Sequence, residues 1–116
     1  MRPWVLAAGL NGFMAVAFAA YTAHGLAGQT YAQGLAERAW QFQLLHALAV
    51  LAAERLGRPG RLACLLFTLG IVLFSGSLYM KALAGSLAVP LVTPAGGLCL
   101  LAGWLALTAG AGMKEK

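Results

Sequence analysis

The chain has 116 residues, of which 61% are hydrophobic and 9% are charged, against roughly 45–50% and 25% in a soluble domain. Eight Lys and Arg against three acids, Glu37, Glu54 and Glu115, give a formal net charge of +5. This composition excludes a soluble globule, a disordered chain and a disulfide scaffold, and the scattered basic residues do not suit nucleic-acid binding.

The apolar residues fall into four runs, each close to the length of about 20 residues that a helix needs to cross a bilayer. Glycine and proline separate the runs, most clearly at Gly57-Arg58-Pro59-Gly60 and at Pro90 and Pro94. None of the runs alternates as a strand would. The sequence predicts one all-α domain over 1–116, an antiparallel integral membrane four-helix bundle with short loops and approximate spans at 4–22, 39–55, 62–82 and 94–111.

The first run has an alternative interpretation as a secretory signal. Arg2 precedes it, and the small triplet Ala17-Phe18-Ala19 resembles a cleavage site. Asn11 and Gly12 in the middle of the run favour a helix that packs in a bundle. We therefore expect a true first span.

The second run and its flanks carry most of the polar residues of interest. His46 lies about eight residues inside this span, or about 12 Å deep, and Gln43 is one turn above it on the same face of the helix. Ser75 and Ser77 of the third span are expected at a similar depth, with Tyr79 above them. Five residues nearer the outer end are expected to converge as an outer mouth: His24, Glu37, Gln41, Lys81 and Thr93.

Two interpretations of the deep polar layer remain open. In one, it forms a polar pocket or proton relay that opens outward around His46. In the other, it consists of interhelical hydrogen bonds that fix the register of the helices. No acidic residue lies deep in any span, which disfavours a proton or cation pathway. At the outer mouth, Lys81 is expected to reach the interface or to pair with Glu37.

Small residues recur every seven positions in each run, a pattern that lets helices approach closely in lipid. In the fourth run the pattern consists of glycine, which costs a helix about 1 kcal/mol relative to alanine and therefore indicates helix packing. The packing glycines are Gly96, Gly103 and Gly110, with Gly70 in the third run. The other sets are Ala8, Ala15 and Thr22; Ala39, His46 and Ala53; and Ala63, Gly70, Ser77 and Ala84.

Basic residues predict the orientation, because Lys and Arg of short loops stay in the cytoplasm. Six lie on one side of the predicted bundle and two on the other, which places both termini and the middle loop in the cytoplasm. The six are Arg2, Arg55, Arg58, Arg61, Lys114 and Lys116, and the two are Arg38 and Lys81. Besides fixing topology, the loop arginines are placed to bind anionic phospholipid headgroups. We expect Trp4, Trp40 and Trp104 to be interfacial anchors.

Motifs for metals, haem or catalysis are not found in the sequence. It contains no HExxH, no CxxC and no nucleophile–base–acid set. Cys64 and Cys99 are expected at different depths, too far apart for a disulfide. We expect no cofactor, no metal and no enzyme activity.

Several short stretches together resemble a known family. They are Ala23-His24-Gly25-Leu26, Trp40-Gln41-Phe42-Gln43 followed by His46-Ala47-Leu48-Ala49, Phe74-Ser75-Gly76-Ser77-Leu78-Tyr79, and Thr93-Pro94-Ala95-Gly96-Gly97-Leu98 with Gly103-Trp104. The chain resembles the domain of unknown function 423 family, whose bacterial members are inner-membrane proteins and whose animal relatives are called transmembrane protein 256. The resemblance implies four helices in the bacterial cytoplasmic (inner) membrane and no established activity.

Three functions are compatible with this sequence. The favoured one is a structural or accessory membrane protein that packs against a membrane-protein partner or against itself as a homo-oligomer, with a dry interior and a glycine-bearing face outside the bundle. The second is a small-solute or proton transporter or channel that uses the layer around His46 and needs a water path to the middle of the membrane. The third is a lipid or quinone binder with a lateral opening near Trp40 or Tyr79.

Overall fold

The computed structural model describes residues 2–85 and 91–111, and these form helices and short turns. The helices are α1 (Pro3–Gly25), α2 (Thr30–Ala53), α3 (Gly57–Gly70), α4 (Gly76–Ala84) and α5 (Val92–Ala111), with a five-residue π-helical segment, η1 (Ile71–Ser75), between α3 and α4. Because α3, η1 and α4 follow one another without a break, they make one rod. The all-α prediction of four helices is confirmed.

The helices extend beyond the apolar runs that predicted them. The largest difference is in α2, which begins at Thr30 although the predicted span begins at 39. The added turns contain Gln33, Glu37 and Arg38, which do not interrupt a helix but are too polar for an apolar run. Gly28 and Gly57 adopt positive φ angles of 85° and 72°, a backbone conformation that glycine accepts without strain, in the connections on either side of α2.

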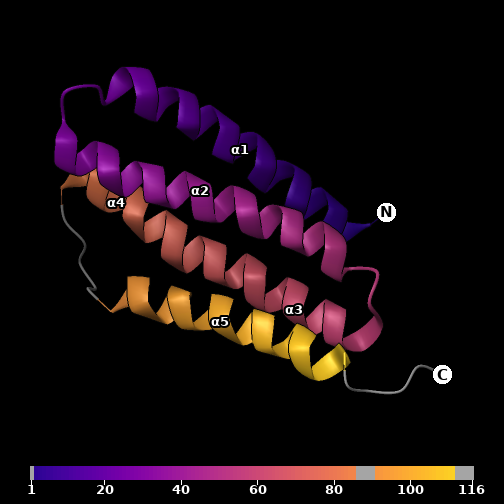
Figure 1. Cartoon of the computed structure of the whole chain (residues 1–116). Helices are drawn as coiled ribbons and strands as arrows, with labels where there is room; N and C mark the ends of the chain where they lie inside the picture. Colours follow the sequence, from indigo (N-terminus) through magenta and orange to yellow (C-terminus); the bar gives the residue numbers. More distant parts are fainter. Residues whose placement is uncertain (1, 86–90, 112–116) are drawn as a thin grey trace.

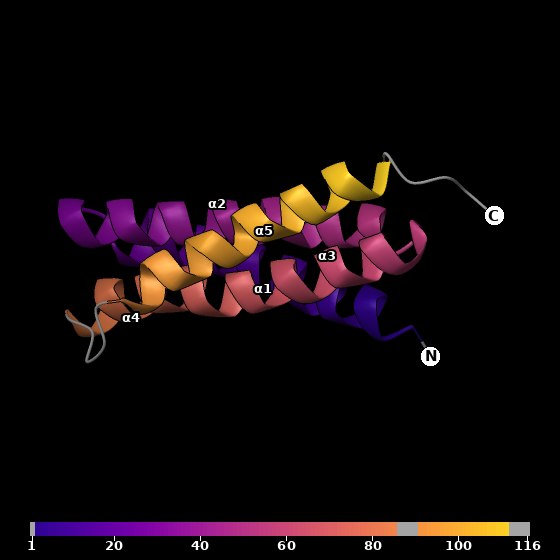
Figure 2. The same cartoon turned by 90° about the horizontal axis from the view of Figure 1, so that it is seen from below.

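Figure 1 shows the rods side by side in the order α1, α2, α3–η1–α4 and α5, each reversing the direction of the one before it. The start of α1, the turn between α2 and α3 and the end of α5 therefore lie at the same end of the bundle. Seen from below, α5 crosses α3 obliquely (Figure 2). The α1 helix packs mainly on α2, and α5 packs mainly on α3 and η1, whereas α2 contacts α1, α3, η1 and α4. The central helix is thus α2.

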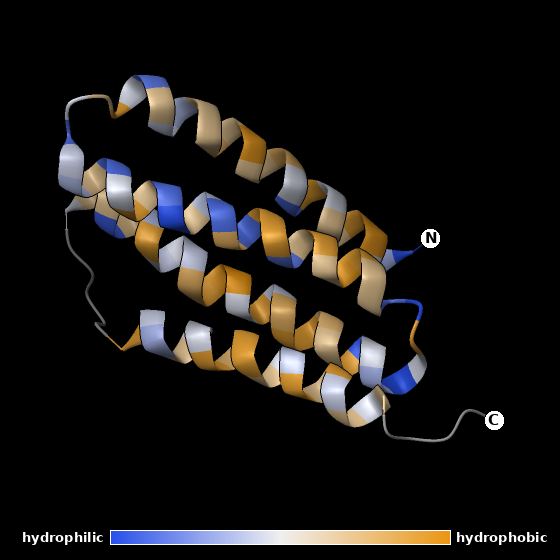
Figure 3. Ribbon diagram, in the orientation of Figure 1, coloured by the Kyte–Doolittle hydropathy of each residue, from blue (hydrophilic) through white to orange (hydrophobic). Residues whose placement is uncertain are grey.

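Three of the rods are long and apolar enough to cross a membrane: Pro3–Gly25, Gly57–Ala84 and Val92–Ala111. The α2 helix is not among them, and Figure 3 shows its repeated hydrophilic stretches beside the largely apolar α5. Among the four rods, the one that is not apolar enough to meet this criterion is therefore also the one that the others surround most.

The residues buried in α1 are those of its seven-residue pattern, Ala8, Ala15 and Thr22. The corresponding set of α2, Ala39, His46 and Ala53, is also buried. In the third rod, Ala63, Gly70 and Ser77 are buried but Ala84 is exposed at the end of α4. Small side chains thus line the contacts between rods, as helix association in lipid requires.

The four glycines predicted to pack helices lie between α5 and the third rod. A Cβ added at Gly96 would overlap the backbone nitrogen of Phe74, and one added at Gly103 would lie 2.6 Å from the ring of Phe67. A Cβ at Gly70 would meet the side chain of Leu100, and one at Gly110 would lie 2.5 Å from Pro59 Cβ. The α5 helix can approach this closely only because these positions have no side chain.

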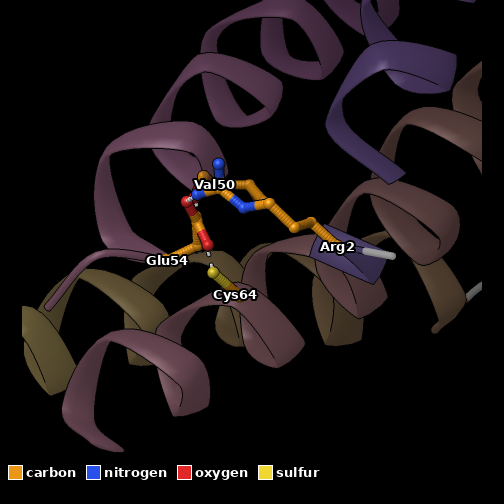
Figure 4. A network of polar contacts seen from close by, with 4 residues as sticks. All are labelled: Arg2, Val50, Glu54 and Cys64. Atoms are coloured by element: carbon orange, nitrogen blue, oxygen red, sulfur yellow. Dashed lines mark hydrogen bonds and ion pairs between the residues drawn. The ribbon is translucent and has the colours of Figure 1, made fainter. Parts of the chain in front are cut away.

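Polar contacts connect the rods at the end where α1 starts. Figure 4 shows Arg2, at the start of α1, paired with Glu54 at the end of α2. The thiol of Cys64 in α3 lies 3.4 Å from the carbonyl oxygen of Val50 and donates to it. Cys64 and Cys99 are both free.

We predict that Gly96→Ala destabilises the fold by about 1–3 kcal/mol, because the new methyl group forces α5 away from the η1 backbone. The measurement is the free energy of reversible unfolding in mixed detergent micelles. The matched control is Gly97→Ala, where the nearest atom to the new Cβ is a Phe74 ring carbon at an ordinary 3.8 Å. Equal stabilities of the two variants would contradict the close approach of α5 at Gly96.

Candidate functional site

His46 is buried, with 3% of its surface exposed, and both of its ring nitrogens have partners. Its Nδ1 lies 2.8 Å from the carbonyl oxygen of Phe42, and its Nε2 lies 3.0 Å from Nε1 of Trp104 in α5. Since an indole N–H can only donate, His46 Nε2 accepts this hydrogen bond. The proton of the imidazole is therefore on Nδ1, which donates to Phe42, and His46 is neutral.

Aromatic rings surround this imidazole. The ring centres of Phe42, Phe67 and Trp104 lie 5.9, 5.3 and 5.8 Å from that of His46, and Phe67 and Trp104 are 4.9 Å apart. Trp104 is 43% exposed, so its indole separates His46 from the outside of the bundle. A polar ring is thus enclosed by apolar surface contributed by α2, α3 and α5.

Gln43 is the centre of a second network, on the α1 side of α2. Its side chain donates to Asn11 Oδ1 over 3.0 Å and accepts from the Tyr79 hydroxyl over 2.6 Å. Asn11 in turn donates to the carbonyl oxygen of Ala7, and the Tyr79 ring stacks on Phe18 with centres 4.0 Å apart. This network joins α1, α2 and α4.

The two serines make further contacts between helices. Ser75 of η1 donates to the carbonyl oxygen of Ala39 in α2 over 2.8 Å. Ser77 of α4 hydrogen-bonds to the hydroxyl of Thr93 in α5 and lies 2.9 Å from the Phe74 carbonyl oxygen. Each serine is more than 95% buried, and each has a protein partner.

The polar side chains expected around His46 form separate hydrogen-bond contacts in the structure. Among the described residues, no hydrogen bond joins His46 to Gln43, Ser75 or Ser77; each belongs to a separate contact. The reason is helical geometry, because three residues advance a helix by about 300°. Gln43 and His46 therefore face neighbouring directions about 60° apart, one toward α1 and α4 and the other toward α3 and α5.

The predicted outer mouth is likewise not assembled as one group. His24, Glu37 and Gln41 are exposed, and Thr93 bonds to Ser77. Lys81 lines an open pocket of about 370 Å³ together with the start of α2. In the described part of the chain, no hydrogen bond or ion pair joins Lys81 to Glu37. The ion pair found there is between Arg2 and Glu54.

Trp104, which was expected to be an interfacial anchor, donates its indole N–H to His46. His46 and Trp104 each lie seven positions before the last residue of their helices, Ala53 and Ala111. The two helices end on the same side of the bundle, so both side chains lie about 10 Å from that end. The equal spacing of His46 and Trp104 from the ends of their helices was present in the sequence. It indicates an equal depth only once the two helices are known to run in the same direction.

The polar side chains of this region are held by fixed hydrogen bonds. Neither the pocket at Lys81 nor a second one beside Arg58 reaches Gln43 or His46. Across residues 2–85 and 91–111, no three His, Cys or acidic side chains are grouped so that they could hold a metal ion.

Comparisons with known proteins find one family. A family model described as Protein of unknown function (DUF423) matches residues 18–97. A UPF0382 membrane protein of Haemophilus influenzae is 39% identical over 107 residues, covering 87% of this chain and 86% of the relative. The UPF0382 inner membrane protein YgdD of Escherichia coli K12 is 35% identical over 120 residues, covering 95% and 89%. No solved structure matches the chain.

We predict that His46 carries its proton on Nδ1, and that Trp104→Phe weakens this preference, because it removes the donor to Nε2 and leaves only the Phe42 carbonyl oxygen to favour a proton on Nδ1. The measurement is the pair of imidazole ¹⁵N chemical shifts in histidine-labelled protein in lipid nanodiscs. The exposed His24 is the internal control, and its tautomers should not change in the variant. A His46 protonated on Nε2 in the unmodified chain would contradict the Trp104 hydrogen bond.

We also predict that Gln43→Leu destabilises the bundle by about 0.6–2 kcal/mol for each hydrogen bond lost. The same substitution at Gln41, two positions away and exposed, should not destabilise it, because leucine is at least as soluble in lipid. Unfolding free energies in micelles measure both variants. Tyr79→Phe should lower the free energy of unfolding of the unmodified chain. If it does not lower it in the Gln43→Leu variant, the two side chains are coupled as the network requires.

Proposed function

This chain belongs to the family described as Protein of unknown function (DUF423), and from this premise we propose that it is a small structural or accessory membrane protein that packs against partner membrane proteins or a second copy of itself. The resemblance found in the sequence is confirmed. The chain is a multi-pass protein of the inner membrane: its relatives are named membrane proteins, one is named an inner membrane protein, and three of its helices are long and apolar enough to cross a bilayer.

The proposal includes a crossing by α2, so that all four rods span the membrane in an antiparallel bundle. With 24 residues, α2 is about 36 Å long, enough for the hydrocarbon core. Its deep polar groups, Gln43 and His46, have partners on neighbouring helices, which lowers the cost of placing them in lipid. The charged residues Glu37 and Arg38 lie nearer the N-terminal end of α2.

The proposed orientation has both termini and the α2–α3 turn in the cytoplasm. Arg2, Arg55, Arg58 and Arg61 lie at or near the end of the bundle where α1 starts and α5 ends. Lys114 and Lys116 follow α5 in the sequence. This accumulation supports the orientation, because basic residues of short loops stay in the cytoplasm.

The interior supports a structural role. The buried polar side chains Thr22, Gln43, His46, Ser75 and Ser77 all have hydrogen-bond partners within the protein. Thr22 bonds within α1, and the other four join helices, which fixes the register of a bundle. We propose that they carry neither a catalytic reaction nor a transport path.

The observation that carries the proposal is the outward face of α1. A Cβ added at Gly9 or Gly12 would meet nothing within 4 Å, whereas the packing glycines of α5 are filled by their neighbours. Phe13 and Val16, one turn further on, are 73% and 61% exposed. Glycine weakens a helix, and in a membrane it permits close approach by another helix. This face is shaped for a helix that does not belong to the same bundle.

The test is cysteine cross-linking in native membranes. In a chain with Cys64→Ala and Cys99→Ala, we predict that Phe13→Cys gives a cross-linked product of defined mass. Adding Gly9→Leu should reduce the yield about tenfold, because the new side chain blocks close approach without meeting any atom of its own bundle.

The matched control is Leu101→Cys on α5, which is 60% exposed. It lies ten positions before Ala111, as Phe13 lies ten positions after Pro3, so both cysteines have similar depths. A product from Leu101→Cys as abundant as that from Phe13→Cys would show collision rather than a specific face. The mass of the product distinguishes a second copy from another protein.

A further inference from the structure

An open groove of about 290 Å³ lies between the first turns of α3 and the last turns of α5. Figure 1 shows these helix ends beside each other, at the end of the bundle where α1 starts. The lining is Arg58, Pro59 and Leu62 from α3 with Ala106, Ala109 and Gly110 from α5. Arg58 is the one charged residue in this lining, and the other residues provide almost only apolar surface.

Small side chains on α5 shape this groove. Gly110 brings the end of α5 against Pro59. Ala106 and Ala109 present only methyl groups toward the same side, and Leu62 on the opposite wall is 51% exposed. The result is a furrow on the outside of the bundle, open along its length to whatever surrounds the two helices.

The chemistry of the walls selects the ligand. The lining, which includes Arg58, offers almost no polar surface, so a water-soluble polar molecule gains little there. A hydrocarbon chain gains dispersion contacts along the furrow. A guanidinium prefers phosphate, to which it can donate two parallel hydrogen bonds.

We propose that this groove is a binding site for one anionic glycerophospholipid, with an acyl chain along the furrow and its phosphate on Arg58. The inference rests on the proposed crossing of the membrane, and on the proposed orientation only for the leaflet, which would be the cytoplasmic one. It does not depend on the α1 face.

Arg58 differs from the two nearest arginines in its position relative to the groove. Arg55 and Arg61 have the same charge and are also exposed, but neither lines the groove. General attraction of basic residues to an anionic surface is similar for each residue, whichever it is. A specific binding site instead makes lipid binding depend much more on one arginine than on its neighbours.

The experiment is native mass spectrometry of the full-length chain, purified and exchanged into nanodiscs of phosphatidylcholine with a minor share of phosphatidylglycerol. The unmodified chain should retain one phosphatidylglycerol in preference to phosphatidylcholine. Arg58→Gln should weaken this retention about tenfold, the amount expected for loss of a charge-assisted hydrogen bond. Arg55→Gln and Arg61→Gln should change it less than about twofold, as screened surface charges do.

A second variant tests the apolar part of the site. Ala109→Leu places a larger side chain in the furrow at an exposed position and keeps all arginines. It should lower phosphatidylglycerol retention, while the circular dichroism and unfolding midpoint of the variant show that the bundle is intact. Retention unchanged by Ala109→Leu, or reduced equally by all three arginine variants, would overturn the site in favour of surface attraction.

One further outcome would overturn the proposal: a full-length chain that does not retain phosphatidylglycerol in preference to phosphatidylcholine. The test is separate from that of the proposed function, because cross-linking at Phe13 should be the same in the Arg58→Gln variant. Loss of cross-linking with intact lipid retention would contradict the proposed function alone.

Discussion

The fold depends on how a polar helix is kept away from lipid. The α2 helix carries Gln43 and His46 deep in its length, and lipid offers no hydrogen bonds to either side chain. Three helices solve this on two sides: α1 and α4 supply Asn11 and Tyr79, and α5 supplies Trp104. The rod that carries these polar groups is central because only there can both sides be satisfied.

The glycine contacts make the second half of this arrangement possible. The α5 helix packs on the third rod through positions without side chains, and Gly103 lies against the Phe67 ring. Its neighbour in the sequence, Trp104, then reaches both Phe67 and His46. The close approach of α5 to the third rod thus accounts both for the helix packing and for the hydrogen bond to His46. A bulkier α5 would leave the Nε2 atom of a buried histidine without a donor.

Packing inside the bundle also determines which surfaces remain for other molecules. The α1 helix uses one side, along Ala8 and Ala15, for α2, whereas Gly9 and Phe13 are exposed on another side. The ends of α3 and α5 meet at Gly110 and leave a furrow beside Arg58. The two surfaces differ in chemistry, one suited to another helix and the other to an acyl chain with a phosphate. A small membrane protein can therefore have a partner and a lipid without overlap.

Local pattern was enough to predict the all-α class, the four helices and the small residues buried at contacts such as Ala15 and Gly96, because run length and seven-residue spacing are properties of each helix alone. The partners of the polar side chains were not predictable in this way. Gln43 and His46 are one turn apart in the sequence, yet they face different helices, and Trp104 lies at the depth of His46 only because α2 and α5 end on the same side. Hydrogen bonds between helices depend on the rotation and direction of both, which only the tertiary structure decides.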